Sequence, residues 1–299
     1  MPDKMLLEDQ IRKNERDTVI ICMFMIVLLF SMIFAVGVIL GFPPVVSMVI
    51  GLPLALIYVG TTYNFSVKSV LSAAKARPAN PRVREEKILI YKVEEMAIAA
   101  GLPMPKVYVQ DSSDINAFAT GKKPEEAVIC ATTGALKLLN KEELEGVMAH
   151  EMSHIKNHDI LVATVTVGVV GAIALMAEII LHMIWWGGGG RSRRNVHPGI
   201  MIAAVVLIVL APLLSRLTYL WISRKREFLA DASGAYLTRN PEGLASALEK
   251  IKGDIPDDPK GSQTVAPLYI ANPFKRSLRE SIWSTHPPID ERISRLRSM

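Results

Sequence analysis

Two histidines and a glutamate in the middle of the chain have the types and the spacing of a metal-dependent hydrolytic centre. The segment from His150 to His154 reads HEMSH and matches the pattern HExxH. On a helix, positions four apart differ by about 40° in direction and about 6 Å in height, so two imidazoles can reach one ion. Glu151 would then lie beside the metal, where it can take a proton from water and pass it to a leaving amine. The pattern therefore predicts one zinc ion per chain; a polar helix face with two surface histidines is the alternative.

A hydrolytic zinc needs a third protein ligand and an open fourth position. His158 is excluded by geometry, because it lies two helical turns, about 12 Å, along the axis from His150. The extended pattern HExxHxxGxxH does not occur in the sequence either. The third ligand must therefore come from another part of the chain.

Two apolar segments point to Glu227 as that ligand. Residues 160–184 and 199–222 are expected to form an antiparallel helix pair. His154 lies 30 residues before position 184, and Glu227 lies 28 residues after position 199. If both helices continue beyond their apolar parts, the side chains of His154 and Glu227 lie within about 3 Å of each other along the axis of the helix pair. Asp231, one turn further on the same face, is predicted to fix the tautomer of a ligating histidine. For both carboxylates, an ion pair on a solvated helix is the alternative.

These helices belong to a set of four apolar segments, at residues 19–40, 42–63, 160–184 and 199–222. Each segment is long enough to cross a hydrocarbon core of about 30 Å as a helix. A soluble domain would interrupt such runs with polar faces, so we predict four membrane helices in two hairpins, at 19–63 and 160–222. Core helices of a soluble protein are the alternative. No small-residue cleavage site follows the first run, so this helix is expected to stay as an anchor behind the N-terminal segment 1–18.

Basic residues next to the apolar segments predict the orientation of the chain in a membrane. They lie before the first segment, after the second and after the fourth: Lys4, Arg12, Lys13, Arg16, Lys68, Lys75, Arg77, Arg82, Arg84, Lys87, Arg224, Lys225 and Arg226. Such residues mark the cytoplasmic face. Both termini and the polar domain are therefore expected in the cytoplasm, at the cell (plasma or inner) membrane, although Arg191, Arg193 and Arg194 run against this pattern. This placement of the net charge of +5 favours a lipid bilayer as partner, and no nucleic acid is expected.

The polar segments 64–159 and 223–299 are expected to form one domain of the α-rich α+β class. Residues 81–100 have helical apolar spacing. Three short runs predict a small antiparallel sheet: residues 106–111, 116–121 and 125–133. Asn140 is a good N-cap for the helix that carries HEMSH, and this helix is expected to run straight on toward the third apolar segment.

Four sequence features together resemble the HtpX membrane metalloproteases, whose relatives include the CAAX prenyl endopeptidases. They are HEMSH, EFLAD at residues 227–231, Asn116-Ala-Phe, and Ser284-Thr-His-Pro-Pro. The resemblance covers essentially the whole chain and implies a gluzincin-like zinc protease domain. It implies that zinc is bound by His150, His154 and Glu227 and that Glu151 is the catalytic base. The family role that it implies is quality control, the cutting of misfolded or surplus membrane proteins.

Two further residues are candidates on the same grounds. Asn116 lies in an expected edge strand, whose unpaired backbone can hold an extended substrate by strand addition. The alternative for Asn116 is an ordinary turn between strands. By the resemblance, His286 would stabilise the oxyanion formed at the scissile carbonyl. A loop histidine without a role is the alternative.

These observations predict a membrane-anchored zinc endopeptidase. Its expected substrates are unfolded or misfolded membrane polypeptides, including copies of itself. The alternatives are a prenyl-protein endopeptidase, which would need an enclosed membrane chamber, and a non-catalytic scaffold with a structural zinc. A transporter that uses Glu178 and His182 is disfavoured, because four helices without broken midplane segments do not suit one. Both side chains are expected near the far headgroups.

Overall fold

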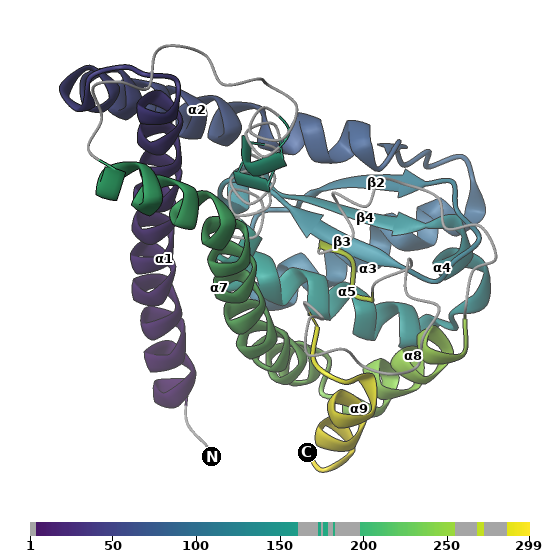
Figure 1. The fold of residues 1–299 in the computed structure, drawn as a ribbon. Helices are drawn as coiled ribbons and strands as arrows, with labels where there is room; N and C mark the ends of the chain where they lie inside the picture. The colour runs from purple at the N-terminus through teal and green to yellow at the C-terminus, as the bar shows by residue number, and fades with distance from the viewer. Residues whose placement is uncertain are drawn as a thin grey trace. The chain divides into compact units, whose positions relative to one another are not determined.

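The computed structural model describes residues 4–160, 173–174, 176–178, 182, 198–254, 268–271 and 286–299. The chain divides into two compact units. One unit comprises residues 12–65 and 165–219, and it holds most of the apolar helices. The other comprises residues 1–11, 66–164 and 220–299, and it holds the sheet and the HEMSH segment (Figure 1).

Long helices with exposed apolar side chains build the first unit. They are α1, Lys4–Ile39, from residue 12 on; α2, Pro44–Ala73, up to residue 65; and α7, Pro198–Thr238, up to residue 219. In α2, an 18-residue window has a mean hydropathy of 1.9, and only 17% of that window is buried. Val45, Val49 and Ile57 are 71%, 63% and 61% exposed. A continuous apolar surface of this kind suits lipid better than water. Within the described residues, α2 is the helix that is long and apolar enough to cross a membrane.

The four predicted membrane segments have different outcomes. Segment 42–63 lies in α2 and is a candidate span. Segments 19–40 and 199–222 lie in α1 and α7, whose apolar stretches are shorter than a span among the residues described. Segment 160–184 and the loop after it fall largely outside the described residues. Four membrane helices therefore remain a prediction.

A four-stranded sheet, in the order β1-β2-β4-β3, forms the centre of the second unit. Its strands are β1, Arg77–Pro78; β2, Lys106–Gln110; β3, Ala117–Thr120; and β4, Val128–Thr132. β4 pairs antiparallel with β3 but parallel with β2, so the predicted antiparallel sheet is wrong and the sheet is mixed. The reason is that β3 lies at the far edge instead of pairing with β2. β4 returns between them after the 3₁₀ turn Pro124–Glu126 and runs in the direction of β2.

The two faces of the sheet pack into different cores, as the alternation of side chains along a strand requires. Ile129 and Ala131 of β4 join the main core. Cys130, between them, joins Phe118 on the opposite face, where the end of α2 packs through Val70. The sheet is therefore covered on both sides.

Among the described residues, the C-terminal part of α7, from residue 220, belongs to this unit together with these helices: α3, Arg84–Ala100; α4, Thr133–Leu138; α5, Lys141–Lys156; α8, Pro241–Gly253; and α9, Ile289–Arg297. α5 packs between α3 and α8, and α8 in turn packs against α9 (Figure 1). α3 ends at Gly101, whose φ of 69° supports a left-handed cap with bonds to Ala97 and Ile98. The predicted helices over 81–100 and after Asn140 are both confirmed.

Helix α5 begins with a capping box and ends at a sharp turn. The Asn140 side chain accepts the Glu143 N–H at 2.8 Å, and the Glu143 carboxylate accepts the Asn140 N–H at 2.7 Å. These bonds satisfy amides that a helix N-terminus otherwise leaves unpaired. The helix ends at Lys156, and His158 adopts a left-handed φ of 57°. The prediction that α5 runs straight on is therefore wrong, because the chain turns before helical residues resume at Asp159.

Candidate metal centre

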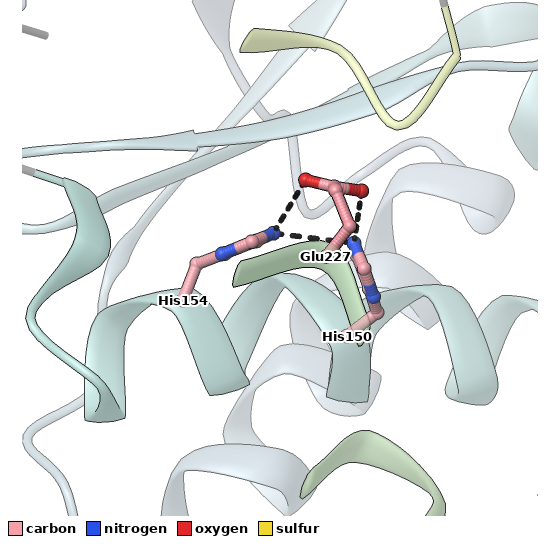
Figure 2. A group of neighbouring side chains, drawn as sticks. All are labelled: His150, His154 and Glu227. Atoms are coloured by element: carbon pink, nitrogen blue, oxygen red, sulfur yellow. Dashed lines mark hydrogen bonds and ion pairs between the residues drawn. The ribbon is translucent and has the colours of Figure 1, made fainter. Parts of the chain in front are cut away.

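Helix α5 places His150 and His154 one turn apart, with both rings pointing to the same side (Figure 2). Their Nε2 atoms lie 3.2 Å apart. The rings are nearly perpendicular, at 88°, with centroids 4.8 Å apart. Each neutral imidazole presents a lone pair from Nε2 when Nδ1 carries the proton. Two such atoms at this distance repel each other unless a cation or a proton lies between them.

Glu227 reaches the two histidines from the C-terminal part of α7 (Figure 2). Its Oε1 lies 3.5 Å from His154 Nε2, and its Oε2 lies 3.7 Å from His150 Nε2. α7 can approach α5 this closely because residue 234 is a glycine: a Cβ there would lie 3.0 Å from the His150 backbone nitrogen. Gly234 follows Glu227 by about two helical turns and lies on the same face. The glycine thus allows α7 to bring the carboxylate over the histidines.

These three side chains fit a divalent metal ion. Their ligand atoms all lie within 4.8 Å of one another, and no other such group of histidine, cysteine or acidic side chains occurs among the residues described. Two imidazoles and one carboxylate are a known ligand set of hydrolytic zinc. Bonds of about 2.0–2.1 Å at tetrahedral angles separate neighbouring ligand atoms by about 3.4 Å. The observed distances of 3.2, 3.5 and 3.7 Å bracket that value. Glu227 Oε2 is buried without a well-aligned hydrogen bond, which a metal-ligand role explains.

The charges around the centre keep Glu227 ionised. Although burial opposes it, the nearby His286 and Arg292 hold the pKa of Glu227 well below its usual value. Burial lowers the pKa of His150, against the opposing effect of Asp231. For His154, burial is outweighed by its carboxylate neighbours, which raise its pKa well above the usual value. The site therefore combines an ionised carboxylate with two histidines whose pKa values are shifted in opposite directions.

Glu151 has the properties of a general base. It is buried on α5 directly after His150, and burial raises its pKa to about 7. The backbone of Ala119, in β3, hydrogen-bonds its carboxylate. A carboxyl group whose pKa lies near neutrality can both accept and return a proton.

Arg292, in α9, is a charged residue of this centre that is absent from the residues predicted from the sequence. It is fully buried, and its Nε and Nη2 donate to the two oxygens of Asp231, each at 2.8 Å. Its Nη1 lies 3.2 Å from Glu227 Oε2. A sequence signal was present, because Arg292 shares the apolar face of α9 with Ile293 and Leu296 at helical spacing. A basic residue on a face that is otherwise apolar needs buried carboxylates as partners.

We expect Arg292→Met to lower the free energy of unfolding by about 3–5 kcal/mol, because Asp231 and Glu227 would stay buried without their cation. Chemical denaturation of the metal-free protein in detergent measures this. Arg297→Met is the matched control, since Arg297 is an exposed arginine of the same helix and pairs only at the surface. Equal destabilisation by the two substitutions would contradict the buried role of Arg292.

The structure places three other residues that the sequence analysis considered. Asp231 Oδ1 lies 3.0 Å from His150 Nδ1, although without a well-aligned hydrogen bond. His286 is buried, with its Nδ1 3.2 Å from Glu227 Oε2. His158 is exposed at the turn after α5, away from the ligand atoms. Asp231 and His286 therefore join the cluster, whereas His158 does not.

Asn116 lies at the start of β3, where the chain itself occupies its amide. Asn116 Nδ2 donates to the Ala271 carbonyl at 2.8 Å, and the Ile270 N–H donates to the Ala117 carbonyl at 2.9 Å. Residues 268–271 thus cover the part of the edge where a substrate strand was expected. A substrate would have to displace this segment or pair farther along β3, so a binding role for Asn116 stays a prediction.

Glu178 and His182 are exposed residues of the other unit. Neither belongs to the group of possible metal ligands. Their expected place near the far headgroups stays a prediction.

A helix-borne histidine pair, a distant glutamate and a buried carboxyl group beside them define the class of hydrolytic metalloenzymes. Residues 84–299, which include all of these side chains, match the family described as Peptidase family M48. The chain therefore belongs to peptidase family M48 and is a metalloprotease.

Several relatives are similar over most of their length. One, named Protease HtpX homolog, from Streptococcus uberis, is 43% identical over 98% of this chain and 100% of the relative. Another of that name, from Thermoanaerobacter pseudethanolicus, is 46% identical over 81% of each chain. Among solved structures, Ste24p of S. mikatae aligns at 20% identity with a TM-score of 0.44, over 85% of this chain and 64% of that chain.

Proposed function

We propose that this chain is a membrane-anchored zinc endopeptidase. The observation that carries the proposal is the convergence of His150, His154 and Glu227 on one point beside the buried carboxyl group of Glu151. These three side chains would hold one zinc ion per chain and leave a fourth position open. When bound, zinc polarises the scissile carbonyl and activates a water molecule for attack.

Glu151 carries the proton in this proposal. It accepts a proton from the attacking water and delivers it to the leaving amine, a role that suits a pKa of about 7. The Ala119 backbone holds the carboxyl group in place. His286, buried beside Glu227, is the candidate donor to the oxyanion that develops at the carbonyl.

The proposed substrates are unfolded or misfolded membrane polypeptides, in a quality-control role. The protease names of the relatives and the exposed apolar surface of α2 support this proposal. A prenyl-protein endopeptidase would need an enclosed membrane chamber, which takes several membrane helices. Among the described residues, α2 is the one helix that is long and apolar enough to cross a membrane, so this alternative has less support. A scaffold with a structural zinc would leave Glu151 without a role, and structural sites normally use four protein ligands.

The substrate class is tested by incubating the zinc-loaded, full-length protein with unfolded casein and, separately, with a prenylated CAAX-type peptide. Mass spectrometry of the products should show cuts at internal bonds of casein and none in the peptide. Cleavage of the prenylated peptide alone would favour the first alternative. If zinc is bound and neither substrate is cut, the scaffold is favoured.

We further propose that helix pairs 19–63 and 160–222 lie in the cell membrane. The N-terminal segment 1–18 and the two parts of the protease domain, 64–159 and 223–299, would then face the cytoplasm. The basic residues that flank the apolar segments on one side support this orientation.

Cysteine labelling in intact cells measures this topology. In a variant with Cys22 and Cys130 changed to serine, Phe42→Cys is expected to react with a membrane-impermeant maleimide from outside. Glu94→Cys is expected to react only after the membrane is permeabilised. Phe42 and Glu94 are both exposed, so a difference in labelling reports the side of the membrane. Labelling of Glu94→Cys in intact cells would reverse the orientation.

A further inference from the structure

Each histidine of the metal centre has a carboxylate behind its Nδ1 atom, but the two contacts differ. Asp231 directs both oxygens to Arg292 and reaches His150 Nδ1 without a well-aligned hydrogen bond. Asp159 Oδ2, by contrast, makes a hydrogen bond of 3.3 Å with His154 Nδ1. Asp159 thus makes the aligned hydrogen bond to its histidine, although Asp231 is the nearer carboxylate, 3.0 Å from His150 Nδ1.

A continuous helix could not bring Asp159 to this position. Five positions along a helix correspond to a rotation of about 140° and a rise of about 7.5 Å, so Asp159 would point away from His154. Instead, α5 ends at Lys156, and His158 takes a left-handed φ of 57°. Such a φ is uncommon for a residue other than glycine. The turn that it makes lets the Asp159 side chain return toward the metal centre.

Arg226 holds the other oxygen of this carboxylate. Its Nε lies 3.3 Å from Asp159 Oδ1, and the two side chains are only 6% and 4% exposed. A buried carboxylate needs charged or hydrogen-bonded partners, and Asp159 has an arginine on one oxygen and an imidazole on the other. Arg226 directly precedes Glu227 in α7. One of these neighbouring residues therefore pairs with Asp159, and the other is a candidate metal ligand.

We infer that Asp159 is a positioning residue of the metal centre. It accepts the Nδ1 proton of His154 and thereby directs the Nε2 lone pair toward His150 Nε2 and Glu227, where the ion would lie. The inference rests on the proposed function, since it concerns a ligand of the same zinc ion. Ligating histidines are commonly fixed in this way, and loss of the outer partner costs about 10–100-fold in metal affinity.

Zinc affinity of the full-length protein in detergent, measured by competition with a chromophoric chelator, tests this inference. Asp159→Ala should raise the Kd for zinc by about 10–100-fold. Asp159→Asn should stay much closer to the unmodified protein, because its amide oxygen can still accept the Nδ1 proton. A residue that served only the fold would not show this rescue.

Glu86→Ala is the matched control. Glu86 is a buried carboxylate that accepts two hydrogen bonds from Arg77, and a third from the Asn80 backbone, so no histidine is among these partners. Its removal should leave zinc affinity unchanged. The inference is overturned if Asp159→Ala binds zinc as tightly as the unmodified chain, or if Glu86→Ala weakens binding equally. If the unmodified chain itself binds no zinc, the proposed function fails, and the inference fails with it.

Discussion

The Glu151→Gln variant is expected to lose proteolysis of unfolded casein by about 10²–10⁴-fold while it keeps its zinc. The amide removes the group that accepts and returns the proton, but it removes none of the three candidate ligands. Casein cleavage and metal analysis of the same preparation measure both effects. We also expect the unmodified protein to cleave itself during purification and the variant to stay intact.

Glu142→Gln is the control for this substitution, because it makes the same chemical change at an exposed position of the same helix. Its activity should match that of the unmodified chain. Full activity of Glu151→Gln would exclude Glu151 as the base. Loss of zinc together with activity would mean that Glu151 contributes to metal binding instead.

Glu227→Ala is expected to yield protein with far less than one zinc per chain, whereas His158→Ala is expected to keep full occupancy. The carboxylate of Glu227 lies 3.5 and 3.7 Å from the two imidazole nitrogens, while His158 points into solvent after the helix has ended. The loss of zinc affinity in Glu227→Ala should exceed the roughly 10–100-fold loss that follows removal of a residue that only hydrogen-bonds to a ligand.

Metal analysis of the two purified variants decides between these residues. Thermal unfolding of both in the presence of chelator controls for a general loss of the fold. If His158→Ala lost its zinc and Glu227→Ala retained it, the choice of the third ligand would be wrong.

The proximity of His150, His154 and Glu227 could be predicted from the sequence because it depends on helical spacing and helical rise. The two histidines of HEMSH lie on one side of any regular helix, and α5 is such a helix. Its start could be predicted from the capping residue Asn140. Glu227 was found by counting helical rise, and α7 does continue as one helix from the apolar segment through Glu227. The same count assumed that α5 also continues, which the turn at His158 contradicts. The turn lies inside the counted stretch between His154 and position 184, so the predicted proximity of Glu227 to His154 is found although one premise of the count is wrong.

Features that depend on long-range packing could not be read in this way. The composition of the three runs predicts that they are strands. It does not predict the order of the strands in the sheet, because a run of β-forming residues carries no information on which other strand it will pair with. The parallel pairing of β2 and β4 follows from where β3 lies, which is a property of the whole sheet. The place of Arg292 on the apolar face of α9 indicates burial, but its partners Asp231 and Glu227 lie far away in the sequence, so the contacts themselves could not be predicted.

We propose that zinc held by His150, His154 and Glu227 makes this chain a protease. Stripping the metal from the purified protein and measuring casein cleavage as zinc is restored in steps tests this proposal. We expect no cleavage without zinc, and activity that rises in proportion to zinc up to one ion per chain. Full cleavage by the stripped protein, or one tightly bound zinc per chain without any cleavage, would contradict it.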